Sequence, residues 1–205
     1  MTIKFIAPQG VQCQRRRWYI PAPEPNGQTW VCPFCPDHET YRRLDSGDMP
    51  REVVGMAMAM CRTEFGVEDD GIETVVWLGQ GGETVFEAAI GAYHVYLSRD
   101  ANPLQILYQG SHEAFHRVCA PPVGVLNWLD EMLAVHFSLV FLERIGQVAH
   151  AVINRTVLRA EAETCSAAQM IAMNAVPYPD GLYGRAYLTG EAMIEAVGWD
   201  LLAPR

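Results

Sequence analysis

The chain has 205 residues, half of them hydrophobic and 19% charged, which is usual for a globular protein with one main core. Its net charge of -9 argues against nonspecific nucleic-acid binding, and no apolar run approaches the roughly 18 residues of a membrane helix. The N-terminus lacks the apolar stretch of a secretory signal, and a chain this long needs no disulfide framework. We therefore expect a cytoplasmic protein.

Residues 1–50 differ from the rest in their proline content. They hold seven prolines, the run Arg15-Arg16-Arg17 and the turn sequence Cys32-Pro-Phe-Cys35. Prolines at this density break helices and favour extended or turn structure. We therefore expect residues 1–50 to be an irregular arm lying on one domain, formed by residues 51–205.

This arm offers a candidate for a second, structural zinc site. Cys32, Cys35 and His38 look like half of a zinc knuckle, and Cys13 could complete a Cys₃His set. Only one CxxC pair is present, so free thiols and a disulfide are the alternatives. The three arginines could contact nucleic acid, but in an acidic protein they are weak evidence for it.

After a first helix, the chain beyond residue 50 is expected to contain a few strands and then only helices. A helix is predicted from an N-cap at Asp48 to Phe65, where Gly66 ends it. Three strands are predicted at Ile72–Leu78, Val85–Ile90 and Tyr93–Leu97, and four helices at residues 104–119, 126–145, 149–175 and 184–197. This order predicts an α+β domain instead of a βαβ array.

The central feature is an HExxH motif within Gly110-Ser-His-Glu-Ala-Phe-His116. His112 and His116 are one helical turn apart on one face, so both imidazoles can bind one ion. Glu113 lies one step round the helix, where it can take a proton from a metal-bound water without being a ligand. Zn²⁺ suits this set because it accepts imidazole nitrogens and keeps a position open for water. The alternative is a helix with two ordinary histidines.

Two histidines leave a catalytic zinc one protein ligand short, and Glu131 on the next helix is the candidate. A proline-containing turn reverses the chain, so this helix can pack back against the motif helix. Glu131 shares a face with Trp128 and Val135, and a carboxylate on an apolar face is costly unless it has a partner. Otherwise Glu131 and Asp130 would both be solvated surface acids.

The HEAFH sequence followed by Trp128-Leu-Asp-Glu-Met-Leu-Ala134 resembles the gluzincin zinc peptidases, particularly the aminopeptidase-N-like catalytic domain. The resemblance covers roughly residues 72–202. It implies a zincin-like fold, in which a small N-terminal sheet and the active-site helix precede an all-helical C-terminal part. It also implies Glu131 as third zinc ligand and hydrolysis of a peptide or protein substrate by a zinc-activated water.

A third segment, from Tyr187 to Gly190, is similar to the family's Tyr-x-x-Gly helix start, whose Tyr hydroxyl donates to the oxyanion of the tetrahedral intermediate. The resemblance implies this role for Tyr187. Tyr183 is the nearby alternative, and both could instead be packing tyrosines. The family's substrate-amine-binding Glu is missing: Ala89 aligns with it and Glu87 is two positions away, which argues against aminopeptidase activity.

The other polar candidates are expected to be structural or solvated. Three histidines, His94, His136 and His150, are expected to pack or lie on the surface, and Asp69 and Asp70 to form a solvated turn. Three cysteines in partly apolar helical contexts are expected to behave as small buried hydrophobes: Cys61, Cys119 and Cys165.

Two other functions fit the motif less well. A SprT-like protease also combines HExxH with a cysteine-rich zinc module, but here the cysteines lie at the opposite end and the net charge is unfavourable. A non-catalytic zinc-binding scaffold would have no use for the base Glu113. The sequence therefore favours a compact zinc peptidase.

Overall fold

The computed structural model describes residues 11–12, 18–21, 29–31, 40–79, 82–87, 91–119, 128–164 and 183–198. Its elements are β1 (Val11–Gln12), β2 (Trp18–Pro21), β3 (Thr29–Val31), β4 (Thr40–Arg43), α1 (Met49–Phe65), β5 (Thr74–Gly79), β6 (Glu83–Glu87), β7 (Ala92–Ser98), α2 (Pro103–Cys119), α3 (Trp128–Arg144), α4 (Val148–Thr164) and α6 (Tyr183–Val197). The architecture is α+β, as predicted. The helix predicted to reach residue 175 is observed to Thr164, and the remainder lies outside the described residues.

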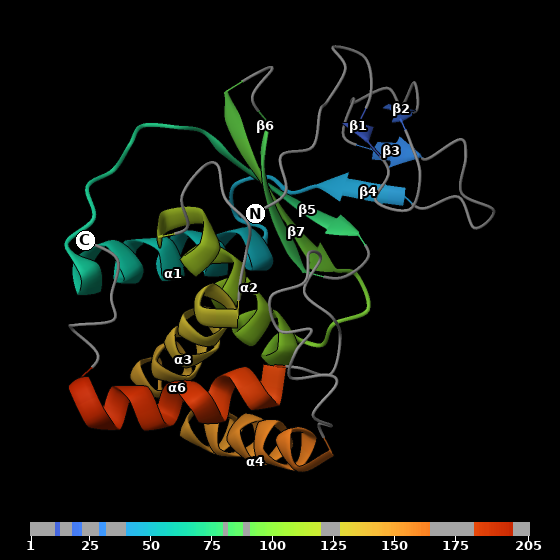
Figure 1. Cartoon of the computed structure of the whole chain (residues 1–205). Coiled ribbons are helices and arrows are strands. Elements are labelled where there is room, and N and C mark those ends of the chain that lie inside the picture. Colours follow the sequence, from blue (N-terminus) through green and yellow to red (C-terminus); the bar gives the residue numbers. More distant parts are fainter. Residues whose placement is uncertain are drawn as a thin grey trace.

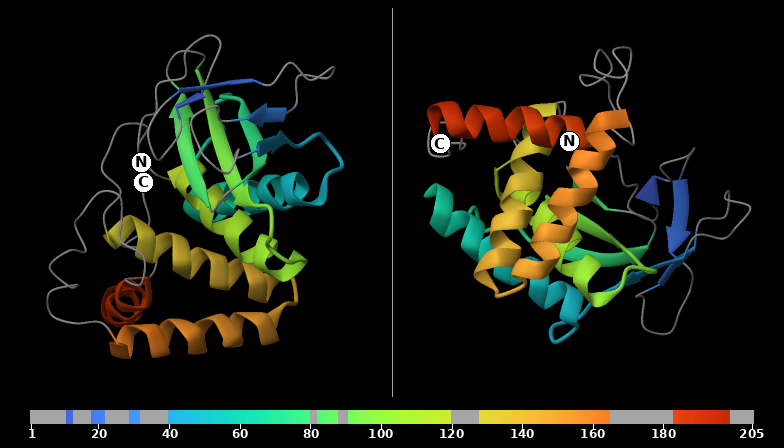
Figure 2. Two further views of the ribbon diagram at one scale, coloured as in Figure 1. Left: turned by 90° about the vertical axis from the view of Figure 1, so that its right-hand side faces the viewer. Right: turned by 90° about the horizontal axis from the view of Figure 1, so that it is seen from below.

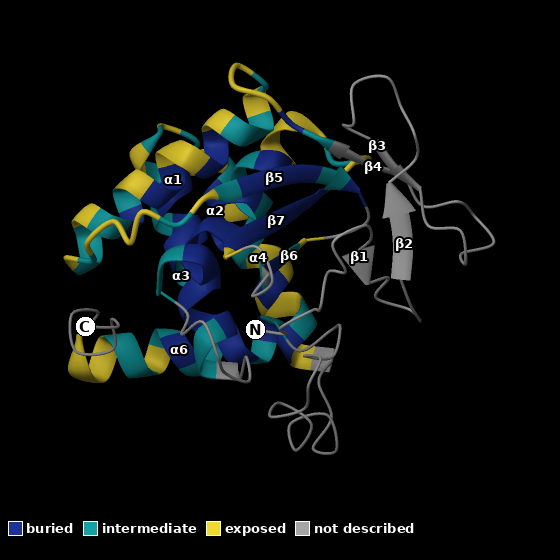
Figure 3. Ribbon diagram, turned by 90° about the horizontal axis from the view of Figure 1, so that it is seen from above, coloured by how far each residue is buried: buried dark blue, intermediate teal, exposed yellow. Residues whose placement is uncertain are grey.

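The strands form one sheet in the order β1-β2-β3-β4-β5-β7-β6. Neighbouring strands are antiparallel except β5 and β7, which pair in parallel from Thr74 with Tyr93 to Gly79 with Ser98. The described helices gather on one side of this sheet (Figure 1, Figure 2). The centre of the sheet is buried at β5 and β7, whereas β6 forms one edge (Figure 3).

The described parts of residues 1–50 differ from the irregular arm that the prolines predict. Strands β1 to β4 extend the sheet beyond β5 through antiparallel pairs. Pro21 is the last residue of β2, and a strand end tolerates a missing N–H better than a strand centre does. Leu44 follows β4 and is fully buried in the main core, so this part of the chain is continuous with the domain.

Helix α2 connects the sheet to the helical layer. It contacts β7 and β6 on one side and α1 and α3 on the others. Every residue from Gly110 to Arg117 is buried. Phe115 packs edge-on against Phe65 of α1 at a ring-centroid distance of 5.7 Å and also contacts Phe137 of α3. The half of α2 that carries the motif is therefore held by packing from several directions.

Helices α3, α4 and α6 complete the fold on the side away from the sheet (Figure 1, Figure 2). Helix α6 contacts both α3 and α4. A Cβ added at Gly190 would lie 2.0 Å from Met132 Cγ, so α6 comes directly against the turn of α3 that follows Glu131. None of the described helices has both the length and the apolar character needed to cross a membrane.

Candidate metal centre

The three predicted zinc ligands meet between α2 and α3. The Nε2 atoms of His112 and His116 are 3.1 Å apart. Glu131 Oε2 lies 3.2 Å from the first of these nitrogens and 3.6 Å from the second. All three side chains are buried. Within the described residues, they are the only group of three or more potential ligands close enough to hold one metal ion.

Helix geometry and packing explain this convergence. His112 and His116 are four residues apart in α2, and α3 packs along α2. Glu131 lies in the first turn of α3 and is 4% exposed, while Val135, one turn later, is fully buried. Its neighbour Asp130 is only partly buried. The solvated position considered for Glu131 is therefore excluded.

The two imidazole nitrogens and the Glu131 oxygen are spaced much like the ligand atoms around a tetrahedral zinc ion. Bond lengths of about 2.0–2.1 Å in a tetrahedron separate ligand atoms by roughly 3.3 Å. The observed separations of 3.1, 3.2 and 3.6 Å bracket that value. Glu131 Oε2 is buried and makes no well-formed hydrogen bond, although two imidazole nitrogens are close to it. The donor set therefore fits a metal ion in size and in chemistry.

The charges of these groups are strongly coupled. Burial alone would raise the pKa of Glu131, but the two histidines more than offset it and hold the pKa well below its usual range. Burial would likewise lower the pKa of His116, whereas the Glu131 carboxylate raises it above the ordinary value. Glu131 thus stays ionised, and a metal ion binding here would compete with a proton for His116.

Glu113 lies one step round α2 from His112, about 100° away, and faces the edge strand β6. The Thr84 hydroxyl donates to Glu113 Oε2 at 2.8 Å and lies 3.0 Å from the Glu113 carbonyl oxygen. Burial raises the pKa of Glu113, although His112, His116 and this hydrogen bond act in the opposite direction. The carboxylate is therefore close to the metal ligands but held by the sheet.

Two residues beside Glu113 were not among the sequence candidates. A Cβ added at Gly82 would lie 2.7 Å from Glu113 Oε1 and 2.8 Å from Gln109 Nε2, so the chain passes very close to both side chains there. Thr84 is the second such residue. A glycine in a turn and a threonine in a strand carry no local pattern that points to a carboxylate on a later helix, so neither could be predicted.

Tyr187 makes its polar and ring contacts with residues other than His112 and His116. Its side chain is fully buried, its hydroxyl donates to Glu191 Oε1, and its ring packs on His136 with the centroids 4.9 Å apart. Burial, assisted by Glu191, raises the pKa of Tyr187 to about 12. The alternative, Tyr183, has its ring edge-on to His112 at 6.1 Å. The geometry thus favours Tyr183 over Tyr187 as the tyrosine of the site.

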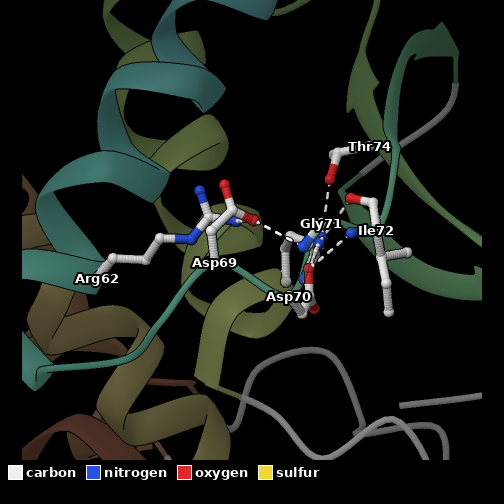
Figure 4. Close-up of polar contacts among 7 residues, drawn as sticks. Arg62, Asp69, Asp70, Gly71, Ile72 and Thr74 are labelled. Atoms are coloured by element: carbon white, nitrogen blue, oxygen red, sulfur yellow. Dashed lines mark hydrogen bonds and ion pairs between the residues drawn. The ribbon is translucent and has the colours of Figure 1, made fainter.

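The last turn of α2 is anchored by Arg117, which follows His116 directly. Its guanidinium donates two hydrogen bonds to the Asp70 carboxylate, at 2.7 and 2.9 Å, and one to Thr74 Oγ1 at 2.7 Å. It also lies 4.0 Å from the centroid of the Tyr93 ring. Figure 4 shows the loop of residues 69–72, which carries Asp70. Asp70 is exposed, as the predicted solvated turn requires, and it also supplies the paired charge that the buried Arg117 needs.

The remaining predicted residues lie elsewhere or outside the described residues. His94 accepts a hydrogen bond from Trp77 Nε1 at 2.9 Å within the sheet, and His136 packs on Tyr187, so neither joins the metal group. The predicted zinc knuckle (Cys13, Cys32, Cys35, His38), Ala89 and the side chains of Glu87 and Trp128 lie outside the described residues.

Comparison with models of known protein families, with curated proteins and with solved structures found no match to this chain.

Proposed function

We propose that this protein is a zinc-dependent peptidase with a compact zincin-like, gluzincin-type fold. The observation that carries the proposal is the convergence of His112, His116 and Glu131 on one point, directly beside Glu113. Two imidazoles and one carboxylate are the ligand set of a catalytic zinc, which keeps its fourth position for water or substrate. When bound there, zinc would polarise a peptide carbonyl and lower the pKa of a coordinated water.

Glu113 is the general base in this proposal. Thr84 donates to Oε2, which leaves Oε1 to accept the proton of the attacking water and later pass it to the leaving amine. The raised pKa of Glu113 makes it a stronger base than an exposed carboxylate. Because the Glu113 side chain is buried, the proton transfer occurs away from bulk water.

The substrate is proposed to be an extended peptide lying along β6. This strand pairs with β7 on one side and forms the edge of the sheet on the other. An edge strand can add a peptide through backbone hydrogen bonds. Gly82, just before β6, and Thr84, near its start, would place such a peptide next to Glu113.

A tyrosine hydroxyl is expected to support the developing negative charge on the carbonyl oxygen. We assign this role to Tyr183 instead of Tyr187, because the ring of Tyr183 lies beside His112. The hydroxyl of Tyr187 is already bonded to Glu191. A Tyr183→Phe variant should therefore lose more peptidase activity than Tyr187→Phe at equal zinc content.

The proposal is tested by incubating zinc-loaded protein with a mixed peptide library and following new termini by mass spectrometry. Cleavage should stop with a chelator, return with added zinc, and be nearly absent in Glu113→Gln, which keeps the ligands but cannot accept the proton. Cleavage by Glu113→Gln at the wild-type rate would contradict the mechanism. A zinc-loaded wild type that cleaves nothing would support the non-catalytic scaffold instead.

A further inference from the structure

Two cysteines from different helices lie in contact at the C-terminal end of α2. Cys61 of α1 and Cys119 of α2 have their sulfur atoms 3.3 Å apart, although 58 positions separate them in the chain. Cys61 is fully buried, while Cys119 is partly exposed. The sequence predicts both as small buried hydrophobes, and both pack in the main core, where their sulfur atoms also come into direct contact.

We propose that Cys61 and Cys119 are a site of reversible oxidation, at which a small hydroperoxide converts the two thiols into a disulfide joining α1 to the last turn of α2. The proposal does not depend on the peptidase function. The sulfur atoms need to move from 3.3 Å to about 2.05 Å, which is a small shift for two side chains already in contact.

The thiol pair is better suited to oxidation than to metal binding. No third His, Cys, Asp or Glu completes a metal group around it among the described residues. A disulfide, in contrast, requires only the two sulfur atoms and compatible backbones. The backbones are held in place because α1 and α2 pack closely, with Val53 Cγ1 only 3.0 Å from where a Cβ on Gly110 would be.

The difference in exposure sets the order of the two steps. Burial raises the pKa of Cys61, with the neighbouring Cys119 adding to the effect, so Cys61 stays protonated and is shielded from oxidants. The partly exposed Cys119 thiol is oxidised first, giving a sulfenic acid and releasing the alcohol, or water, derived from the hydroperoxide. The Cys61 sulfur then attacks the Cys119 sulfur, the S–S bond forms, the S–O bond breaks, and the hydroxide leaves with the Cys61 proton as water.

The disulfide would brace the helix turn that follows His116. Cys119 lies three residues after this ligand, and neither sulfur belongs to the metal group. Oxidation should therefore leave the zinc content unchanged. It should raise the melting temperature by on the order of 5 °C, because the cross-link closes a long loop and restricts the unfolded chain.

The experiment uses the full, zinc-loaded chain treated with a modest excess of hydrogen peroxide, alkylated and digested with trypsin. Cleavage after arginine gives one peptide of residues 52–62, which contains Cys61, and one of residues 118–144, which contains Cys119. The expected product is these two peptides joined, with the loss of two hydrogen atoms. A dithiol reductant should separate them and reverse the rise in melting temperature.

Two variants control this experiment. Cys119→Ala changes a partly exposed residue, so it should fold, and it should lose both the joined peptide and the temperature rise. Cys165→Ala leaves the pair intact and should behave as wild type. The proposal is overturned if both thiols remain alkylatable after treatment, if either joins a different cysteine, or if Cys119 proceeds to sulfinic acid without joining Cys61.

Discussion

Two adjacent faces of helix α2 present the motif residues to different parts of the fold. On one side, His112 and His116 face α3, and Glu131 completes the group through helix–helix packing. On the adjacent face, Glu113 faces the edge of the sheet, where Thr84 donates to its carboxylate and Gly82 leaves room for it. The ligands and the base are thus positioned by separate contacts.

This separation means that metal binding and proton transfer should respond to different substitutions. A change on α3 should release the metal, because it removes or displaces a ligand. A change on β6 should leave the metal in place and reduce turnover, because it moves only the base.

Replacing a ligand on the α3-facing side should have the largest effect. His116→Ala is expected to weaken zinc binding by far more than the roughly 10- to 100-fold typical of losing a supporting residue. Zinc retention after dialysis against a chelator, measured by mass spectrometry of the metal, checks this. His136→Ala is the matched control, since His136 is a histidine of α3 that packs on Tyr187 instead. Equal zinc retention in the two variants would disprove the ligand assignment.

Zinc affinity should depend on pH through His116. Its pKa is raised above the ordinary 6.5, so a proton competes with the metal over a wider range than at an exposed histidine. Below that raised pKa, the apparent affinity should fall about tenfold per pH unit for each proton displaced, and above it the affinity should level off. Glu131 adds no slope there, because its pKa is lowered. Competition titrations at several pH values measure this, and a flat profile would contradict it.

The smallest effect concerns the sheet-facing side. Gly82→Ala places a methyl group 2.7 Å from Glu113 Oε1, so the carboxylate must shift. We expect kcat to fall by about 10- to 100-fold with no change in zinc content. Gly55→Ala is the control, because a Cβ there meets nothing within 4 Å. Loss of zinc in Gly82→Ala would show that the two sides are not independent.

The sequence predicted those parts of the fold and site that depend on local pattern. The i, i+4 spacing placed His112 and His116 on one face, and the apolar face around Glu131 predicted its burial against α2. The helix from Met49 to Phe65, with Gly66 in a left-handed conformation after it, is also confirmed. These features follow from neighbours within a few residues of each other.

The parts that were missed depend on contacts between distant segments. The bonds from Thr84 to Glu113 and from Arg117 to Asp70 join residues 29 and 47 positions apart, which no local periodicity reveals. Tyr183 and Tyr187 are one turn apart in α6, so spacing alone could not decide which of them lies beside His112. The packing of α6 on α3 and α4 makes that choice.

The central claim is that Glu131, and not its neighbour Asp130, completes the metal group. The most direct test is a chelator titration of zinc-loaded wild type, Glu131→Ala and Asp130→Ala, with the zinc content measured at each step. Adjacent helical residues point about 100° apart, so only one carboxylate can face the two histidines. Glu131→Ala should release zinc at chelator concentrations that the wild type withstands, and Asp130→Ala should bind nearly as tightly as the wild type. Release from Asp130→Ala with retention by Glu131→Ala would contradict the account.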